Sequence, residues 1–479
     1  MAEKTPNAAA RDETGDTEIV TDAAPATANA NEGVLSPRYR WISIGMCSLI
    51  LLAAFESLAV TTIMPAVSAD LNGQSLYALA FAGPLAVSVV GMVLAGNWSD
   101  RRGPRGALLV SVLLFTIGLI IAGTAQTMEV LVAGRLLHGF GGGGITVSLY
   151  VIVARVYPAL LQPRIFAGFA AAWVVPSLIG PFLAGVVAEA FSWHWVFLGV
   201  VVLVVPALAM VLPAVRGLGQ KPSPDAAPWS ISRIAWSALA AIAVLALNLS
   251  ADADGVFRWI LPVASVAVLA LAVRPLLPVG TLRAASGLPG VVLFRGLIAG
   301  AFFGAEIYIP YLLTDQYGLT PVYAGLGLTL GGVAWGLASQ VQGRYAATLS
   351  HQACIRIGLA LLGVGLVAAI VTTVFALPAL VLILGWGVGG AGMGIMYPRT
   401  SVMALQSASP AEQGFTSSAI SISDGIGSAL SIALTAIVFV ALTPFGGAWP
   451  FVGCFALAAA IGLLAAVTSG RASVAPHAA

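Results

Sequence analysis

Long apolar stretches separated by short polar segments fill this chain from residue 41 to residue 469. A helix needs roughly 20 apolar residues to cross about 30 Å of hydrocarbon. The pattern predicts fourteen such helices, at 41–66, 76–98, 106–126, 129–156, 165–190, 194–214, 232–250, 256–277, 288–314, 321–343, 353–376, 378–405, 414–442 and 447–469. The seventh and eighth, which flank the acidic turn from Ala251 to Gly255, could instead form one re-entrant hairpin, although each is long enough to cross.

The composition supports an all-α polytopic membrane protein. Of 479 residues, 59% are apolar and 8% are charged, whereas a soluble chain carries about 25% charged residues. No soluble interior could hide this much apolar surface, so lipid must cover it. Residues 1–40 are polar and predict a disordered tail without a cleavable signal peptide. The three cysteines have no metal or disulfide spacing.

Basic residues indicate the orientation of the spans. With the N-terminus in the cytoplasm, 19 of the 21 Lys and Arg fall on the cytoplasmic side, including Arg399, whereas Arg258 falls outside and Arg135 within a span. This distribution agrees with the positive-inside rule. It predicts cytoplasmic chain ends and supports fourteen spans, and a count of twelve would keep the same parity.

The spans divide into two sets of six around a central pair. We expect a six-helix bundle at 41–214, a Pro-rich cytoplasmic linker at 215–231, two additional spans with their connecting loop at 232–287, a second six-helix bundle at 288–470, and a cytoplasmic tail at 471–479. A faint internal repeat favours two related halves, because Pro65 and Asp70 recur at the same spacing as Pro310 and Asp315.

A charged motif, GNWSDRRGPRG, joins the second and third spans. Gly96 would let two helices approach closely, and Asp100 could pair with arginines or lie near a helix N-terminus. This motif resembles the cytoplasmic loop signature of the major facilitator superfamily. The resemblance implies a major facilitator fold and a latch between the halves, formed here by Gly96, Asp100, Arg101, Gly103 and Arg105. An ordinary basic loop is the alternative.

Two charges are predicted at the same depth in the first half. Arg135, in GRLLHGFGGGG, lies about seven residues inside its span, where a charge costs roughly 2.5–3.5 kcal/mol and therefore requires a partner. Glu56 lies nine residues before Pro65, in a span that runs in the opposite direction to the span of Arg135. This spacing brings Glu56 to about the same depth in the membrane as Arg135. Arg135 with Gly139 resembles a family motif that implies proton coupling, with a purely structural pair as the alternative. We expect His138 to be a packed helix residue.

Two further motifs narrow the resemblance. Gly180, Pro181 and Gly185, in PSLIGPFLAG, resemble a signature of antiport exporters, although Pro176 stands where a Gly is usual. Pro181 should also kink its helix. AFESLAVTTIMP, from Ala54 to Pro65, resembles a motif of fourteen-span drug:proton antiporters, with a Glu in place of the usual Asp.

Three acids lie within predicted spans: Glu56, Glu306 and Asp424. Burial favours the protonated form of a carboxyl group, so each is a candidate proton carrier or a permanently protonated side chain. We assign proton coupling to Glu56, Arg135 and Asp424. A substrate pocket is expected at Glu56, Glu306 and Tyr308, among aromatic residues that could equally face lipid.

These features predict a proton-coupled exporter of small amphipathic or cationic compounds, in a bacterial plasma membrane and as a monomer. The alternatives are an exporter of one native metabolite or lipid and, less favoured, an uptake symporter. Four scattered histidines make no catalytic cluster, and no Gly-rich run leads into Lys and Ser or Thr as a nucleotide loop would. We therefore expect no enzyme activity, no cofactor or metal, and no nucleic-acid partner.

Overall fold

A computed structural model describes residues 33–472 apart from 159–160, 217, 219–228, 251–254, 346–347 and 408–412. The predicted N-terminal tail up to residue 32, most of the 215–231 linker, the acidic turn up to Asp254 and the tail after residue 472 lie outside the described residues. Every regular element in the described ranges is helical. The all-α prediction is therefore confirmed.

The first half of the chain forms six long helices, α1 Arg40–Asp70, α2 Leu79–Arg102, α3 Pro104–Gly123, α4 Met128–Val156, α5 Gln162–Ala190 and α6 His194–Val215, with the short η1 Gln74–Leu76 before α2. The central pair is α7 Ile231–Leu249 and α8 Phe257–Val273. The rest forms η3 Thr281–Arg283, α9 Leu288–Glu306, α10 Tyr308–Asp315, α11 Pro321–Arg344, α12 His351–Phe375, α13 Ala379–Gln406, α14 Gln413–Leu442, η4 Thr443–Phe445, α15 Trp449–Thr468 and η5 Ser469–Arg471.

The predicted count of fourteen spans is not confirmed. Twelve helices in the described residues are long and apolar enough to cross a membrane, and α5 makes a thirteenth if its two bent segments are one span. α8 is the exception, because its 17 residues rise about 25 Å, less than the thickness of the hydrocarbon. Of the two central helices, which the sequence also allowed to form a re-entrant hairpin, only α8 is too short to cross.

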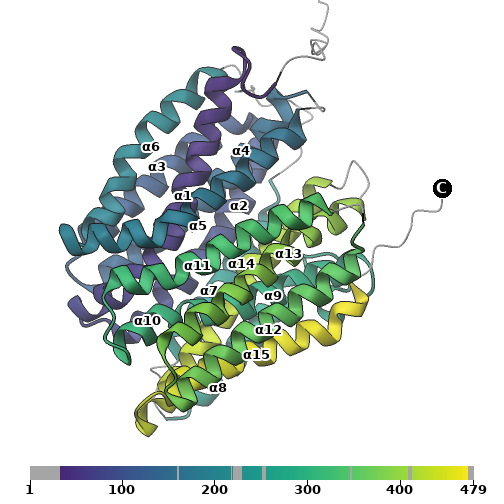
Figure 1. The fold of residues 1–479 in the computed structure, drawn as a ribbon. Helices are drawn as coiled ribbons and strands as arrows, with labels where there is room; N and C mark the ends of the chain where they lie inside the picture. The colour runs from purple at the N-terminus through teal and green to yellow at the C-terminus, as the bar shows by residue number, and fades with distance from the viewer. Residues whose placement is uncertain are drawn as a thin grey trace, which may run out of the picture.

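The helices pack into two halves with the same internal pattern. In the first half α1 packs on α5 and α6, and α4 packs on α2 and α3. In the second half α9 packs on α14 and α15, and α13 packs on α11 and α12. The halves meet through α5 against α11 and α2 against α14, and α7 lies against both α2 and α14. Figure 1 shows the purple-to-teal half above the green-to-yellow half, with α5 and α11 adjoining.

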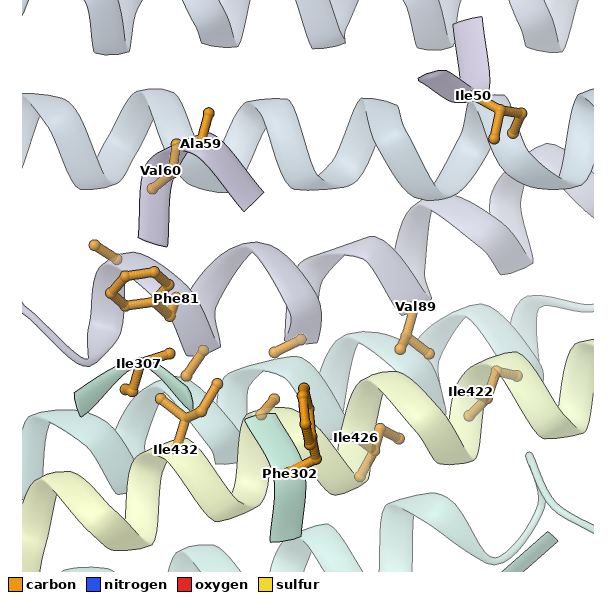
Figure 2. Close-up of a cluster of buried hydrophobic side chains, with 14 of the residues drawn as sticks. Ile50, Ala59, Val60, Phe81, Val89, Phe302, Ile307, Ile422, Ile426 and Ile432 are labelled. Atoms are coloured by element: carbon orange, nitrogen blue, oxygen red, sulfur yellow. The ribbon is translucent and has the colours of Figure 1, made fainter. Parts of the chain in front are cut away.

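The α2–α14 contact is apolar. Phe81 and Val89 of α2 face Ile422, Ile426 and Ile432 of α14 (Figure 2), and all five are less than 9% exposed. Near one end of the molecule the hydroxyl of Tyr77, just before α2, donates to the carbonyl oxygen of Ile307 in the other half. We call this end, where α1 ends and α2 begins, the Tyr77 end, and the opposite end, where α2 ends, the Arg102 end.

Prolines bend two of the helices. α5 turns by 43° between Ser177 and Ile179, because Pro181 cannot donate to the carbonyl of Ser177, four residues earlier. The predicted kink is therefore confirmed. The ninth predicted span is confirmed as Leu288–Asp315, but its helix is interrupted at Ile307, because α9 ends at Glu306 and α10 begins at Tyr308. Pro310 explains that break, since it leaves the carbonyl of Glu306 without a helical donor.

Glycines bring α4 close to its neighbours. A Cβ at Gly141 would lie 2.6 Å from the carbonyl oxygen of Ser111 on α3, and a Cβ at Gly91 or Gly143 would overlap backbone atoms across the α2–α4 contact. Gly96 was expected to permit such an approach, and this expectation is wrong. A Cβ there would meet only Val147, at an ordinary 3.7 Å.

Candidate functional site

An ion pair joins α1 to α4 in the interior of the first half. Nη1 of Arg135 donates to Oε1 of Glu56, and the two side chains are 5% and 2% exposed. The common depth expected for Glu56 and Arg135 predicted this contact, and the structure confirms it. Each charge would be strongly unfavourable alone in a membrane interior, so the pair is expected to act as a unit.

A second hydrogen bond fixes Arg135 to α2. Its Nε donates to the carbonyl oxygen of Ala80 at 3.1 Å. That carbonyl is available because Pro84, four residues later, has no N–H to donate along the helix. The guanidinium therefore ties α4 to α1 and α2, and its position depends on a proline that the sequence analysis did not single out.

His138 belongs to the same cluster. Its ring is 4.5 Å from that of Phe115, and its Nε2 lies 3.0 Å from Oε2 of Glu56. His138 is therefore a packed helix residue, as expected, and it also lies beside the ion pair. The available signal was its spacing of three residues from Arg135, which puts both side chains on one helix face.

The second half holds its own buried cluster. Nε of Arg295, on α9, donates to Oδ1 of Asp424, on α14, at 3.1 Å. Nη1 of Arg295 donates to the carbonyl oxygen of Tyr397 at 2.7 Å, and to the hydroxyls of Thr400 and Ser401 at 2.8 and 3.2 Å. The hydroxyl of Tyr397 donates to Oδ2 of Asp424. Three helices, α9, α13 and α14, thus meet around one guanidinium.

Asp424 was expected from the sequence, but its partners were not. Arg295 and Arg399 were counted among the cytoplasmic basic residues, and this is wrong: they lie within α9 and α13 and are 7% and 5% exposed. The first half also contributes to the cluster, because the phenol of Tyr150, on α4, interacts electrostatically with Arg295 and Asp424.

Glu306 lies beside a group of aromatic rings. It is half-buried at the end of α9, where its carboxyl interacts with the indole of Trp386. Phe302 stacks on Trp386 with ring centroids 4.7 Å apart, and it meets Phe303 and Trp335 edge-on at 5.4 Å each. Carboxylate and aromatic faces together suit an organic cation.

Tyr308 does not join this group, although the sequence analysis assigned both residues to one pocket. The break after Glu306 turns Tyr308 toward Phe439, whose ring it stacks on at 5.3 Å, and toward Tyr77 at 6.1 Å. The hydroxyl of Tyr77 donates to the carbonyl oxygen of Ile307 at 2.6 Å. Tyr308 therefore belongs to the contact that closes the two halves at the Tyr77 end.

The predicted latch residues lie at the Arg102 end. Asp100 is exposed and interacts electrostatically with Arg155 of α4, which donates to the carbonyl oxygen of Ser99 at 3.1 Å. Arg101 lies over the ring of Trp229, and Nη1 of Arg105 is 3.3 Å from the carbonyl oxygen of Arg216. Gly103 has φ +79°, a conformation that requires glycine between α2 and α3.

The predicted antiporter motif lies where the halves meet. A Cβ at Gly185 would lie 2.8 Å from Cα of Val322 on α11, and a Cβ at Gly325 would lie 2.5 Å from the carbonyl oxygen of Pro181. Gly180 instead faces Phe55 of α1. Residues 177–185 of α5 therefore pack against α11 more closely than larger side chains would allow.

Two bundles of apolar helices with buried charges at their centres define a transporter of the helical, two-half class. The chain belongs to the Major Facilitator Superfamily, whose family model matches residues 46–305, more than half of its length.

Two relatives have names that indicate efflux, and one of them covers most of the chain. A probable multidrug-efflux transporter of Mycobacterium tuberculosis is 29% identical over 440 residues, which is 88% of this chain and 91% of the relative. Multidrug resistance protein 3 of Bacillus subtilis is 30% identical over 158 residues, covering 33% of this chain and 31% of that protein. The chain is thus a transporter whose relatives at this modest identity are named for efflux.

Solved structures support the fold alone. A POT family transporter in complex with a thioalcohol-conjugated peptide aligns with a TM-score of 0.68 at 15% identity, covering 90% of this chain and 96% of that one. Another, in complex with 5-aminolevulinic acid, aligns with a TM-score of 0.66 at 16% identity, again over 90% and 96%. These neighbours confirm the major facilitator fold.

Proposed function

We propose that this transporter exports small amphipathic or cationic compounds in exchange for protons, by alternating access of its two halves. It would act in a bacterial cell membrane, with both chain ends in the cytoplasm. The names of the relatives support efflux. The observation that carries proton coupling is the buried cluster of Glu56, Arg135 and His138.

The charge balance of this cluster supplies a mechanism. With Glu56 ionised, its carboxylate and the guanidinium of Arg135 cancel. A proton added to Glu56 leaves the charge of Arg135 uncompensated in an apolar interior, which is unfavourable until the cluster rearranges or meets water. Proton uptake would therefore favour a different arrangement of the halves, and proton release would favour the return.

The substrate would bind elsewhere. Oε1 of Glu56 accepts from Arg135, Oε2 lies 3.0 Å from Nε2 of His138, and the side chain is 2% exposed, so in this state it is not available to a ligand. Glu306 is half-buried and lies beside half-buried aromatic rings of Phe303 and Trp335. A cationic compound with apolar rings would match this combination of one carboxyl and several aromatic faces.

The test is Glu56→Gln, which removes the titratable group and preserves the volume. We expect the variant to lose substrate accumulation in inside-out vesicles driven by an imposed pH gradient, because the cluster can no longer exchange that proton. It should retain binding of a neutral substrate. Glu129→Gln, an exposed acid at the start of α4, is the matched control and should transport normally.

Full gradient-driven transport by Glu56→Gln would refute this assignment and make Asp424 or Glu306 the next candidate carrier. Wild-type protein that transports without any response to the pH gradient would refute proton coupling itself.

A further inference from the structure

A groove between the two central helices leads to a pair of arginines. The groove has a volume of about 700 Å³ and is lined by Trp236, Leu239, Val268, Leu271, Arg274 and Pro275. A neighbouring cavity of about 370 Å³ shares Arg274 and Pro275, and it adds Arg233, Leu277, Pro278, Val279, Leu288, Phe415 and Thr416. The groove is almost entirely apolar, whereas the smaller cavity has a larger polar share in its lining.

Both arginines lie at the same level of the membrane. α7 begins at Ile231 and α8, which packs against it, ends at Val273, so Arg233 and Arg274 are at one end of this helix pair. The backbone N–H of Ser230 donates to Oδ1 of Asn97 at 2.9 Å, which places that end beside the end of α2. The smaller cavity is therefore at the Arg102 end, at the depth of lipid headgroups if the helices span the bilayer.

Three other features of the smaller cavity favour an anion. Thr416 is fully buried, and its Oγ1 has no hydrogen-bond partner among the described residues. It lies in the first turn of α14, which begins at Gln413, where backbone N–H groups lack helical acceptors and the helix dipole attracts negative charge. Within the described chain, no carboxylate lies within 4 Å of Arg233 or Arg274.

We propose that this is a binding site for an anionic glycerophospholipid. The phosphate would lie among Arg233, Arg274 and the hydroxyl of Thr416, and one acyl chain would follow the apolar groove past Trp236. Charge complementarity selects the headgroup, because clustered arginines at the membrane surface favour anionic over zwitterionic lipids. The continuous apolar groove selects a lipid over a free anion. The site also joins α14, which carries Asp424, to the central pair.

Lipid competition observed by native mass spectrometry tests the site. Delipidated full-length protein is incubated with equal amounts of phosphatidylglycerol and phosphatidylcholine of matched chains. We expect the wild type to retain phosphatidylglycerol with a preference of roughly 30-fold, since two arginines lie near the phosphate. Arg233→Gln combined with Arg274→Gln should bring the preference close to one. Thr416→Val should weaken it without altering charge.

Arg283→Gln is the matched control, because Arg283 is an exposed arginine of η3 that lines neither cavity. It should keep the wild-type preference. Equal retention of both lipids by the wild type, or an equal loss in the Arg283 variant, would overturn the proposal. Displacement of the lipid by millimolar inorganic phosphate would show an ion site without a lipid chain and would also overturn it. If the double variant does not elute as a folded species, the two single substitutions and Thr416→Val decide the question.

Discussion

Replacing Arg295 with Gln should destabilise the protein more than replacing its partner Asp424 with Asn. The side chain of Arg295 is 8% exposed and that of Asp424 is 25% exposed. Without the guanidinium, the carboxylate loses its cation, and the carbonyl of Tyr397 and two hydroxyls lose a charged donor. Without the carboxylate, Arg295 keeps three oxygen acceptors from α13.

The geometry sets the magnitudes. Removing one partner of a fully buried ion pair costs about 3–5 kcal/mol, and the partial exposure of Asp424 should hold the cost of Arg295→Gln near the lower end, about 3 kcal/mol. Asp424→Asn should cost about 1–2 kcal/mol, because the guanidinium remains hydrogen-bonded.

A double-mutant cycle measures the interaction directly. The free energy of unfolding in detergent, followed by tryptophan fluorescence, should give a coupling energy of about 1–3 kcal/mol between the two sites. The double variant should therefore be more stable than the sum of the single effects predicts. Additive effects, or a larger loss for Asp424→Asn than for Arg295→Gln, would refute this account of the cluster.

Three further predictions concern helix contacts. Tyr77→Phe removes a hydrogen bond between the halves and should weaken closure at the Tyr77 end by about 0.5–1.5 kcal/mol. A cysteine placed at that end should then be labelled faster, and an unchanged labelling rate would contradict the prediction. Gly143→Val should lower the free energy of unfolding by roughly 1–3 kcal/mol, because its Cβ would meet the backbone of α2. Gly363→Val, where a Cβ meets nothing within 4 Å, should leave stability unchanged. Asp100→Asn should insert normally but slow transport in vesicles at equal expression, and wild-type rates would refute its role in a latch.

Most helices were predictable from the sequence, because in a membrane protein each long apolar stretch forms a helix of about the same length. α1 to α6 and α11 to α15 begin and end close to the predicted stretches. The break at Ile307 was not predicted, since hydropathy stays high through it and only Pro310 marks it. Hydropathy also overestimated α8, whose helix stops at Val273, before Pro275.

Charges within the spans were predictable one by one, but their partners only in part. Glu56 and Arg135 were matched because each had an unambiguous depth within its own span. Arg295 lies as far inside its predicted span as Arg135 does, but it was grouped with the cytoplasmic arginines because no motif singled it out. The meeting of α9, α13 and α14 is a long-range contact, and no local pattern reports it.

The distribution of polar contacts suits two halves that move against each other. Three hydrogen bonds described between the halves lie from the middle of the α5–α11 contact to the Tyr77 end: Tyr77 to Ile307, Ser177 to Gly332 and Glu189 to Val322. At about 0.5–1.5 kcal/mol each, the three contribute roughly 1.5–4.5 kcal/mol. One charge that moves through 100 mV supplies about 2.3 kcal/mol, which is the same scale.

The ion pairs Glu56–Arg135 and Arg295–Asp424 each lie within one half, so a rigid movement of the halves need not break either one. If those pairs instead crossed the interface, opening would leave buried charges unpaired at about 3–5 kcal/mol each, and one proton could not drive it. Strong electrostatics inside each half and weak, mostly apolar contact between the halves is therefore the arrangement that the proposed exchange requires.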